Sequence, residues 1–456
     1  MRLSASNLSR LPGAVAVPAY NRDARGVGIV HFGIGAFHRA HQAAYTDDVM
    51  AAEKGDWRIL GVSLRSCQVR DQMQPQGGLY TMVERRADAT KLRIIGSVAD
   101  VVVASAERER LVATLAAPTT HIVSFTITEK GYCRSSDGSL DRALADSQSA
   151  YRYLAEAFAQ RRHAGLPGLT LLSCDNLARN GAQLHRLMGA YLAAHAPDLQ
   201  YWFEAECTCP ATMIDRIVPA TSDTDRAEIE AMLGMRDAAA VVTEPFSQWI
   251  IEDKFAGPRP LWENHGAQIT SDVHAYETAK LRMLNGAHSA LAYLGLRRGH
   301  EFVHQTIADP ELASLINRLM REEAAPSLMP TPGQQLSAYA DTLVERFKNP
   351  ALNHRLIQIA MDGSQKIPQR WLETLAFHQQ NGGHCPAILE ALAAWILHVR
   401  GDTHAVDDPM RHVFYKAWQT AGSAGIAQQL FGSRGVFAAY WNADDRSLAI
   451  LNADLQ

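Results

Sequence analysis

The stretch K-L-R-M-L-N-G-A-H, residues 280–288, combines a lysine, an asparagine and a histidine at helical spacing. At about 100° per residue, Asn285 lies about 140° and His288 about 80° from Lys280 around the helix axis, so the three share one broad face. If that face is buried, the pKa of the Lys280 ammonium group falls toward neutrality and the lysine can act as a general base. From spacing alone, a solvated polar face is the simpler interpretation.

Asn285 and His288 would then act on a reacting oxygen and its neighbour. The amide of Asn285 can donate hydrogen bonds to an alkoxide or carbonyl oxygen, and His288 can hold an adjacent hydroxyl group. A second amide comes from S-C-D-N-L-A-R-N-G, residues 173–181, in which Asn176 follows a strand-like run. Asp and Asn also commonly begin helices, and for this stretch alone helix capping is the simpler interpretation.

A glycine-rich stretch near the N-terminus adds a candidate cofactor site. In V-G-I-V-H-F-G-I-G-A-F-H-R-A, residues 27–40, an apolar run meets Gly33 and Gly35. The stretch nearly matches the dinucleotide fingerprint G-x-G-x-x-G, with His38 in place of the third glycine. Gly33 would permit the tight turn, and Gly35 would let the backbone approach a pyrophosphate at the start of a helix near Ala36. The alternative is a strand-to-helix turn without a ligand.

A base, a pair of groups that hold an oxygen atom and a dinucleotide together indicate hydride transfer at a secondary alcohol. The periodicity of apolar residues predicts the strands and helices that would position these groups. Over the first 175 residues, apolar runs alternate with helical ones, which indicates a mostly parallel sheet covered on both faces. Because ligands bind beyond the carboxyl ends of such strands, G-I-G-A-F, T-I-T-E-K-G-Y and S-C-D-N would line one edge. The expected strands are 28–32, 57–64, 92–97, 121–128 and 169–173, and the expected helices are 38–53, 106–116 and 143–164.

From about residue 277 helical spacing dominates to the end of the chain. The predicted plan is an α/β fold with two domains, a mostly parallel sheet domain at 1–276 and an all-helical domain at 277–456. Small-molecule sites commonly lie between domains, so the active site is expected in an interdomain cleft. The expected helices of the second domain are 278–296, 310–323, 335–346, 353–360 and 385–400.

Composition limits the partners and the compartment. The 456 residues are 47% hydrophobic and 20% charged with a net charge of -4, which argues against nucleic acid as the main partner because phosphate binding needs a basic surface. No apolar run approaches the roughly 20 residues that span a bilayer, and the N-terminus lacks the apolar core of a signal peptide. The six cysteines lack zinc spacing, which indicates reduced thiols, and a cytoplasmic protein is expected.

Six motifs, taken in this order, resemble the polyol-specific long-chain dehydrogenases. They are H-F-G-I-G-A-F-H-R-A-H-Q, T-I-T-E-K-G-Y, S-C-D-N-L-x-x-N-G, M-I-D-R-I-V-P, E-P-F-S-Q-W-I-I-E-D and K-L-R-M-L-N-G-A-H-S. The resemblance runs from about residue 28 to 400, and K-x-x-x-x-N-x-x-H is a distinctive motif. It implies an oxidoreductase that uses no zinc or other metal ion, with a Rossmann-type domain followed by a helical C-terminal domain.

The resemblance also implies roles for individual residues. Lys280 matches the catalytic base of the family. Asn176 and Asn285 match the pair that clamps the reacting oxygen, and His288 matches a substrate-orienting residue. Glu277, one helical turn before Lys280, matches a carboxylate that passes the proton of the base to solvent.

Two further matches concern the substrate. Asp215, in M-I-D-R, matches an acidic active-site residue, and Lys366, in D-G-S-Q-K, matches a substrate-contacting lysine. Mannitol dehydrogenases place an arginine eight residues before that lysine, where this chain has Gln358. The run around Lys366 is closer to the fructuronate reductases of the same family. A sugar acid needs a cation for its carboxylate, which Lys366, Arg370 or Arg355 could provide.

The choice of cofactor depends on the end of the second strand. Relatives that carry an acidic pair after L-R-S select NAD through the ribose hydroxyls, whereas this chain has Cys67 and Gln68 there, with Arg65 nearby. Without a carboxylate at this place, nothing there repels the 2′-phosphate of NADP. NAD is expected, with NADP as the alternative. The residues expected to bind the dinucleotide are Gly33, Ile34, Gly35, Ala36, Phe37, His38, Arg65, Thr128 and Glu129.

The expected reaction interconverts a secondary alcohol and a ketone on an open-chain sugar derivative. D-mannonate and D-fructuronate are the first expectation, and mannitol and fructose are the alternative. A non-catalytic nucleotide-binding sensor that keeps the fold is a competing class. The intact set of Lys280, Asn285 and His288 argues against it.

Overall fold

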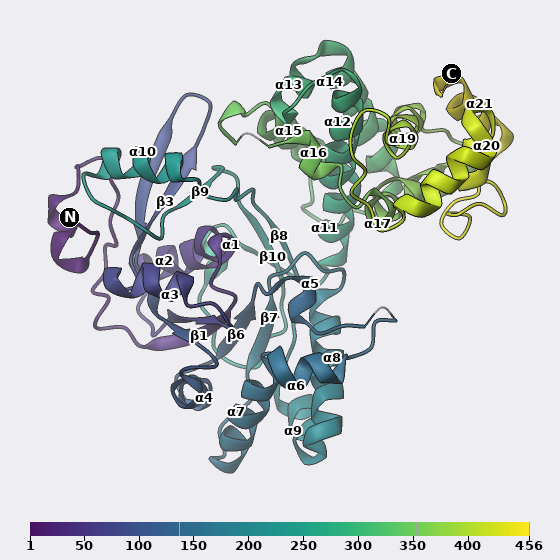
Figure 1. Cartoon of the computed structure of the whole chain (residues 1–456). Helices are drawn as coiled ribbons and strands as arrows, with labels where there is room; N and C mark the ends of the chain where they lie inside the picture. The colour runs from purple at the N-terminus through teal and green to yellow at the C-terminus, as the bar shows by residue number, and fades with distance from the viewer. Residues whose placement is uncertain (136, 353, 456) are drawn as a thin grey trace. The chain divides into compact units, whose positions relative to one another are not determined.

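The computed structural model describes residues 1–135, 137–352 and 354–455. These residues form two compact units, Met1–Val273 and His274–Gln456 (Figure 1). Among the described residues, every strand belongs to the first unit, and the second unit contains helices only. The division at 276/277 into a cofactor domain and a substrate domain stays a prediction.

The first unit is organised around a five-stranded parallel sheet with the spatial order β5-β2-β1-β6-β7. Most residues of these strands are buried, which suits apolar runs such as V-V-V because helices cover both faces of the sheet. The order reverses between β1 and β6, as in Rossmann-type sheets, so the predicted parallel sheet is confirmed. The strands are β1 (Val27–Phe32), β2 (Arg58–Ser63), β5 (Val98–Val103), β6 (Ile122–Phe125) and β7 (Thr170–Ser173).

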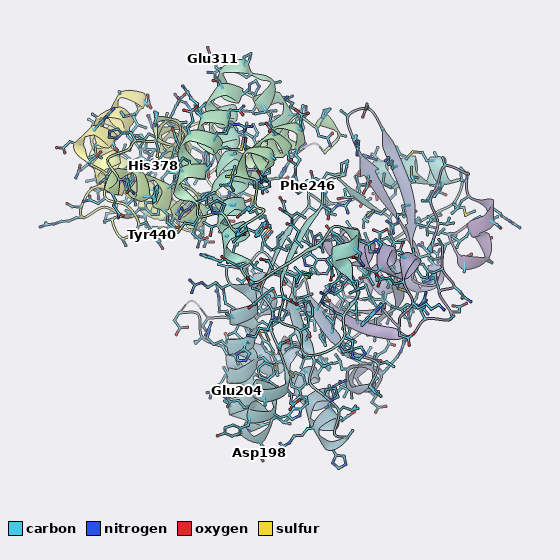
Figure 2. The ribbon with its side chains drawn as sticks, turned by 180° about the vertical axis from the view of Figure 1, so that it is seen from behind. Asp198, Glu204, Phe246, Glu311, His378 and Tyr440 are labelled. Atoms are coloured by element: carbon cyan, nitrogen blue, oxygen red, sulfur yellow. The ribbon has the colours of Figure 1, made fainter. Side chains whose placement is uncertain are left out.

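Two hydrophobic cores lie on the two faces of this sheet. Alternate side chains of β1 enter them, with Val30 and Phe32 in one core and Ile29 in the other. Pro197 occupies the start of α9 and Asp198 its first turn, a favourable helix beginning (Figure 2). The helices of this unit are α1 (Ala36–Ala40), α2 (Gln42–Ala52), α3 (Gln68–Met73), α4 (Arg108–Ala116), α5 (Thr128–Gly131), α6 (Arg142–Gln148), α7 (Tyr151–His163), α8 (Asn180–His195), α9 (Pro197–Glu206) and α10 (Asp223–Leu233), with 3-10 turns η1 (Ala5–Arg10), η2 (Gln74–Gln76) and η3 (Trp262–His265).

The strand predicted at 92–97 is present, but the prediction that it belongs to the parallel sheet was wrong. Residues 92–97 contribute to β4, which pairs antiparallel with β3 in a separate sheet, and β5 occupies the expected place instead. Pairing depends on distant partners, so the apolar character of the run could not distinguish the two sheets. The remaining strands are β3 (Tyr80–Arg85), β4 (Thr90–Ile95) and β9 (Val241–Thr243) in one sheet, and β8 (Thr212–Asp215), β10 (Gln248–Glu252) and β11 (Gln268–Thr270) in the other.

The second unit is a helical assembly whose core packs around α12 and α19. The helices predicted near 335–346 and 385–400 are α15 and α19. The one predicted at 353–360 is the short α16, and Asn353 lies outside the described residues. The elements are α11 (His274–Ala279), η4 (Lys280–Asn285), α12 (Gly286–Arg297), α13 (Val303–Ala308), α14 (Pro310–Arg318), η5 (Leu319–Ala324), η6 (Ala325–Ser327), α15 (Leu336–Phe347), η7 (Pro350–Leu352), α16 (Leu356–Ile359), α17 (Gly363–Ile367), η8 (Pro368–Leu372), α18 (Glu373–Gln380), α19 (Pro386–His398), α20 (Arg411–Phe431) and α21 (Asp445–Asp454).

Three segments of this unit, η4, η5 and η8, are π-helical, and η4 packs against both of the others. In a π-helix, residue i is hydrogen-bonded to residue i+5. Such segments are rare in proteins, and many of those that occur lie at functional sites. The segment η4 contains the lysine and asparagine singled out in the sequence. Within the described residues, no helix combines the length and the apolar character needed to cross a bilayer.

Candidate active site

The carboxyl ends of the parallel strands gather the predicted cofactor residues at one edge of the sheet. Gly33 directly follows β1, and Thr126 directly follows β6, its neighbour. The strand order reverses between these two strands, and this is the place where dinucleotides bind in Rossmann-type sheets. Arg65 follows β2 and is exposed. The predicted cofactor residues therefore come from adjacent strand ends.

Gly33 and Gly35 differ in what the fold requires of them. Gly33 has a φ of 93°, and a Cβ atom there would lie 2.1 Å from the carbonyl oxygen of Thr126. The turn after β1 can therefore hold only glycine at this position. Gly35 has a φ of -81°, and the atom nearest to a Cβ there is the Gly33 oxygen at 3.8 Å. The fold itself leaves room for a side chain at Gly35, which fits a glycine kept for a ligand.

The first turn after the glycines is buried. His38 is fully buried and its ring stacks on His31 with 3.4 Å between centroids. Arg39 donates from Nε to the carbonyl of Gly35 at 3.2 Å and from Nη1 to the carbonyl of Ala239. Arg39 therefore anchors the turn inside the first unit. A phosphate contact by His38 stays a prediction, although its ring faces His31.

The buried histidines also predict how stability depends on pH. Burial lowers the pKa of His31 to about 3 and lowers that of His38 well below its usual value. Because these folded-state values lie below the unfolded value of about 6.5, the unfolded chain binds protons first as the pH falls. Stability from the neutral rings is complete above about pH 6.5 and is lost progressively below it.

We therefore expect the Tm of the protein to fall between pH 7 and pH 5, as measured by thermal denaturation across that range. His38→Asn removes one of the buried protonation sites and should flatten the fall in Tm. His195→Asn changes a half-exposed histidine on α8 and serves as the control. A His38→Asn protein with the same pH dependence as the wild type would contradict the prediction.

The loop after β7 does not cap a helix. Helix α8 begins at Asn180 with Arg179 as its N-cap residue, so the capping interpretation of Asp175 and Asn176 was wrong. The carboxylate of Asp175 instead accepts hydrogen bonds from the loop after β6, and Asn176 lies exposed beside it. Asp215 ends strand β8 and is buried, with 4% of its surface exposed.

In the second unit, the π-helical segment changes the predicted geometry of Lys280 and Asn285. The estimate of about 100° per residue assumed an α-helix, and it does not hold through η4. With i to i+5 bonding, Asn285 lies about one turn beyond Lys280, on the same side. Lys280 is only 7% exposed, so the solvated-face interpretation was wrong for this lysine.

The same region also positions His288 and Glu277. His288 is 8% exposed, and its ring packs against Phe347 and His354 with centroids 4.8 and 5.1 Å away. Burial and neighbouring cationic groups hold its pKa well below the usual range, so the imidazole is neutral. Glu277 lies on α11, one turn before Lys280, and its Oε2 is 3.5 Å from Nδ1 of His274.

Side chains from η8 stabilise the π-helical segment. Arg370 donates from Nη1 to the carbonyl of Asn285 at 3.2 Å and to Oγ of Ser289 at 2.7 Å. Trp371 donates from Nε1 to the carbonyl of Gly286 at 3.1 Å. These bonds satisfy carbonyl groups next to the irregular turn. Burial lowers the pKa of Arg370 to about 10, and its predicted contact with a substrate carboxylate stays a prediction.

The other predicted substrate residues lie on α16 and α17. Lys366 donates from Nζ to the carbonyl of Met361 at 2.6 Å, and burial lowers its pKa. Gln358 is exposed on α16, and Arg355, just before that helix, lies 3.4 Å from Glu301. The structure thus places all three on neighbouring segments of the second unit, and their substrate contacts stay predictions.

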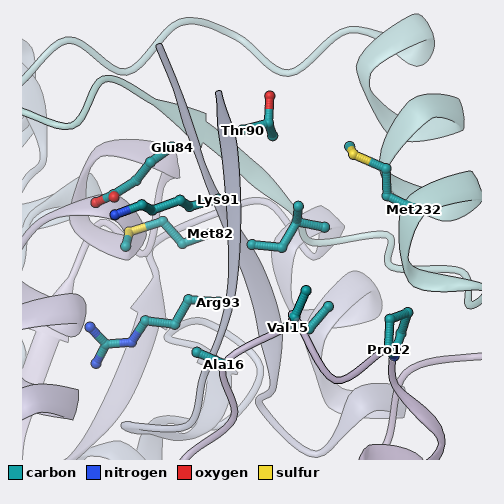
Figure 3. A pocket seen from close by; sticks show the side chains of 11 residues that line it. Pro12, Val15, Ala16, Met82, Glu84, Thr90, Lys91, Arg93 and Met232 are labelled. Carbon is teal, nitrogen blue, oxygen red and sulfur yellow. The ribbon is translucent and has the colours of Figure 1, made fainter. Parts of the chain in front are cut away.

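A cavity of about 550 Å³ in the first unit does not include the predicted residues (Figure 3). Val15, Met82, Leu92 and Met232 provide its apolar lining. The cation of Arg93 at its edge is already paired with Asp47 and Asp48 on α2. Within the described ranges, no cluster of three or more His, Cys, Asp or Glu side chains has an arrangement that could hold a metal ion.

Comparison with known proteins decides the family. The mannitol dehydrogenase Rossmann domain matches residues 27–264, and the mannitol dehydrogenase C-terminal domain matches residues 272–440. The chain belongs to the mannitol dehydrogenase family. This membership confirms the predicted family and, with it, an oxidoreductase that has a Rossmann domain and a helical C-terminal region.

Named relatives and solved structures extend over nearly the whole chain. D-mannonate oxidoreductase of Escherichia coli K12 is 41% identical over 450 residues, covering 94% of this chain and 92% of the relative. Mannitol 2-dehydrogenase of Phaeosphaeria nodorum is 38% identical over 455 residues, covering 95% and 80%. The Pseudomonas fluorescens mannitol 2-dehydrogenase, solved as a ternary complex with NAD and D-mannitol, is 36% identical with a TM-score of 0.83. D-sorbitol dehydrogenase in substrate-free form is 30% identical with a TM-score of 0.90, and each structure covers 100% of this chain and 96% of its own.

The sequence did not predict the hydrogen bonds that Asp175 and Arg370 make beside the predicted residues Asn176 and Asn285. Asp175 is adjacent to the predicted Asn176. Its carboxylate accepts three hydrogen bonds from the segment after β6, which is far away in sequence, and these bonds distinguish it from a helix-capping residue. Arg370 was expected to meet substrate, and its bond to the Asn285 carbonyl could not be inferred from a separation of 85 residues. A signal for Asp175 was present in S-C-D-N, since a carboxylate after a buried strand must find donors.

Proposed function

We propose that this protein is an NAD-dependent oxidoreductase that interconverts D-mannonate and D-fructuronate. The observation that carries the proposal is the buried Lys280, one π-helical turn from Asn285, in a member of the mannitol dehydrogenase family. The glycine pair after β1 supports a dinucleotide, because Gly35 is not required by the fold yet lies at the sheet edge where pyrophosphates bind. Bound NAD would accept the hydride that leaves the alcohol carbon.

The chain's own residues would perform the proton chemistry. Lys280, as the neutral amine, takes the proton of the substrate hydroxyl while the carbon–oxygen bond becomes a carbonyl. Asn176 and Asn285 donate hydrogen bonds to the oxygen as negative charge develops on it. Glu277 passes the proton from Lys280 to solvent. In the reverse direction, protonated Lys280 returns the proton to the carbonyl oxygen.

The sugar acid is preferred over the neutral polyol because of the residues near α17. Gln358 stands where mannitol dehydrogenases have an arginine, and Lys366 and Arg370 can supply positive charge for a carboxylate. The relative named D-mannonate oxidoreductase and the one named mannitol 2-dehydrogenase are about equally similar to this chain, so their names alone do not choose between the substrates. Mannitol and fructose are therefore the second candidate pair.

A substrate panel tests the proposal. The purified protein is mixed with NADH or NADPH and with fructuronate, tagaturonate, fructose or xylulose, and absorbance at the reduced cofactor's wavelength is followed. We expect fructuronate-dependent oxidation of NADH at the highest kcat/KM. A higher kcat/KM with fructose would assign the mannitol reaction, and a higher rate with NADPH would assign NADP. Absence of oxidation with every ketone would favour the nucleotide-binding sensor.

A further inference from the structure

The carboxylate of Asp175 connects two loops that follow neighbouring strands of the parallel sheet. It accepts hydrogen bonds from the backbone N–H of Ile127 at 3.0 Å and of Thr128 at 2.9 Å. It also accepts one from the hydroxyl of Tyr132 at 2.8 Å. All three donors belong to the segment after β6, whereas Asp175 belongs to the segment after β7.

The loop that Asp175 holds has an unusual backbone. Thr128 has a φ of 62°, in the left-handed region that a β-branched residue adopts only when its surroundings impose it. The two hydrogen bonds from Ile127 and Thr128 to one carboxylate provide that constraint. Next to them, Oγ1 of Thr126 donates to the carbonyl of Gly33 at 2.7 Å, so this loop also contacts the glycine turn.

The other side of Asp175 is also fixed. The amide of Asn180 donates to the backbone carbonyl of Asp175 at 3.2 Å and to the carbonyl of Thr212 at 3.0 Å. Asn180 is buried and also accepts from the backbone N–H of Thr212 at 3.0 Å. Thr212 begins the strand that ends at Asp215. Asn176, directly after Asp175, is therefore carried by a loop that is tied on both sides.

We propose that Asp175 is a positioning residue that keeps the cofactor loop at Thr128 and the oxygen-clamping Asn176 at a fixed spacing for hydride transfer. This inference rests on the proposed function, since it assumes that Thr128 contacts the dinucleotide and that Asn176 contacts substrate. The inference follows because the side chain of Asp175 holds the loop at Thr128, while Asn176, the next residue in the sequence, carries the amide. A displacement of about 1 Å between such groups can reduce turnover about 100-fold.

The isosteric Asp175→Asn substitution removes the charge and one acceptor atom. An ionised carboxylate accepts on both oxygens, whereas an amide presents one acceptor and one NH2 group. Whichever way the amide turns, its NH2 group faces at least one of the donors on Ile127, Thr128 or Tyr132. The volume of the side chain is unchanged, so loss of packing does not complicate the comparison.

The experiment compares the wild type with Asp175→Asn and with Asp137→Asn. Asp137 is an exposed carboxylate that also caps a turn, accepting from the backbone N–H of Ser139 at 2.9 Å, so it is a matched control. Measured quantities are Tm, the Kd for NADH by fluorescence titration, and kcat and KM in the ketone panel. We expect the kcat of Asp175→Asn to fall about 100-fold while its Tm shows that the protein is folded. The kcat of Asp137→Asn should equal that of the wild type. A kcat within twofold of the wild type, at any Tm, would overturn the inference.

Two further arms keep the test decisive. If Asp175→Asn does not fold, Tyr132→Phe removes the hydroxyl that bonds the carboxylate of Asp175 at 2.8 Å and Oγ of Ser173 at 2.6 Å. A several-fold fall in kcat then supports the inference, whereas an unchanged kcat overturns it. If the wild type oxidises no cofactor with any ketone, the proposed function fails separately. The Kd for NADH then decides, since a tenfold weaker binding by Asp175→Asn supports the positioning of the cofactor loop and an unchanged Kd overturns it.

Discussion

Replacing Lys280 by methionine is expected to lower kcat by about 100- to 10,000-fold, the range that a positioned general base contributes. The Kd for NADH should change less than about threefold, because the proposed role of the lysine is toward the substrate hydroxyl and not toward the dinucleotide. Methionine keeps the length and apolar character of the buried stem, so the 7% exposure of this side chain is compatible with a folded variant. Stopped-flow and steady-state kinetics with NADH and fructuronate measure the effect.

A second substitution separates a base from a fixed positive charge. Lys280→Arg keeps the charge, but arginine does not lose its proton at accessible pH, so it should be as inactive as the methionine variant. Lys348→Met changes an exposed lysine paired with Glu345 on α15 and is the control, expected to retain full activity. Turnover close to the wild type in Lys280→Met would show that the assignment of the base is wrong.

Substitutions at Gly33 and Gly35 should separate the two reasons for which a glycine can be required. Gly33→Ala places a methyl group 2.1 Å from the carbonyl oxygen of Thr126, at a φ of 93°. The left-handed backbone alone costs about 1–2 kcal/mol for a non-glycine residue, and relief of the clash must move β1 or the segment after β6. We expect a large fall in Tm and in the yield of folded protein, measured by thermal denaturation and size-exclusion chromatography.

Gly35→Ala should have the opposite pattern. A Cβ atom at this position meets nothing closer than 3.8 Å, and the backbone is one that alanine adopts, so Tm should be unchanged or slightly higher. If the backbone at Gly35 approaches a pyrophosphate, the methyl group should weaken NADH binding at least tenfold, which is about 1.4 kcal/mol. Isothermal titration with NADH measures it. A wild-type Kd in Gly35→Ala would remove this glycine from the cofactor site.

Short motifs and local periodicity predicted the parts of this molecule that depend on neighbours in sequence. An apolar run followed by two glycines predicts a strand and a turn, and the strand β1 ends at Phe32, directly before Gly33. Alternation of strands and helices predicted the parallel sheet, and helical spacing predicted the second unit. The pairing of β4 with β3 was not predictable in this way, because both candidate sheets accept the same apolar run.

The residue types of the candidate site could be read from the sequence, and their geometry could not. K-L-R-M-L-N-G-A-H indicates a lysine and an amide on one helix, but the helix is π-helical there, and the angle between the two side chains depends on that. The irregular turn is stabilised by Arg370 and Trp371, each bonded to a carbonyl 85 residues away along the chain.

The amino-acid sequence was sufficient to indicate the family, the alternation of strands and helices around a parallel sheet, the helical second unit and the chemical groups available for proton and hydride transfer, because each of these is a property of local pattern or of residue type. Tertiary structure alone decided that Lys280 is buried, that η4 is a π-helix, and that the carboxylate of Asp175 holds the loop at Thr128, 47 residues away in the chain. The physical reason is the same in each case. Burial and hydrogen bonding between distant segments are set by which surfaces pack together, and that packing is the joint result of the whole unit.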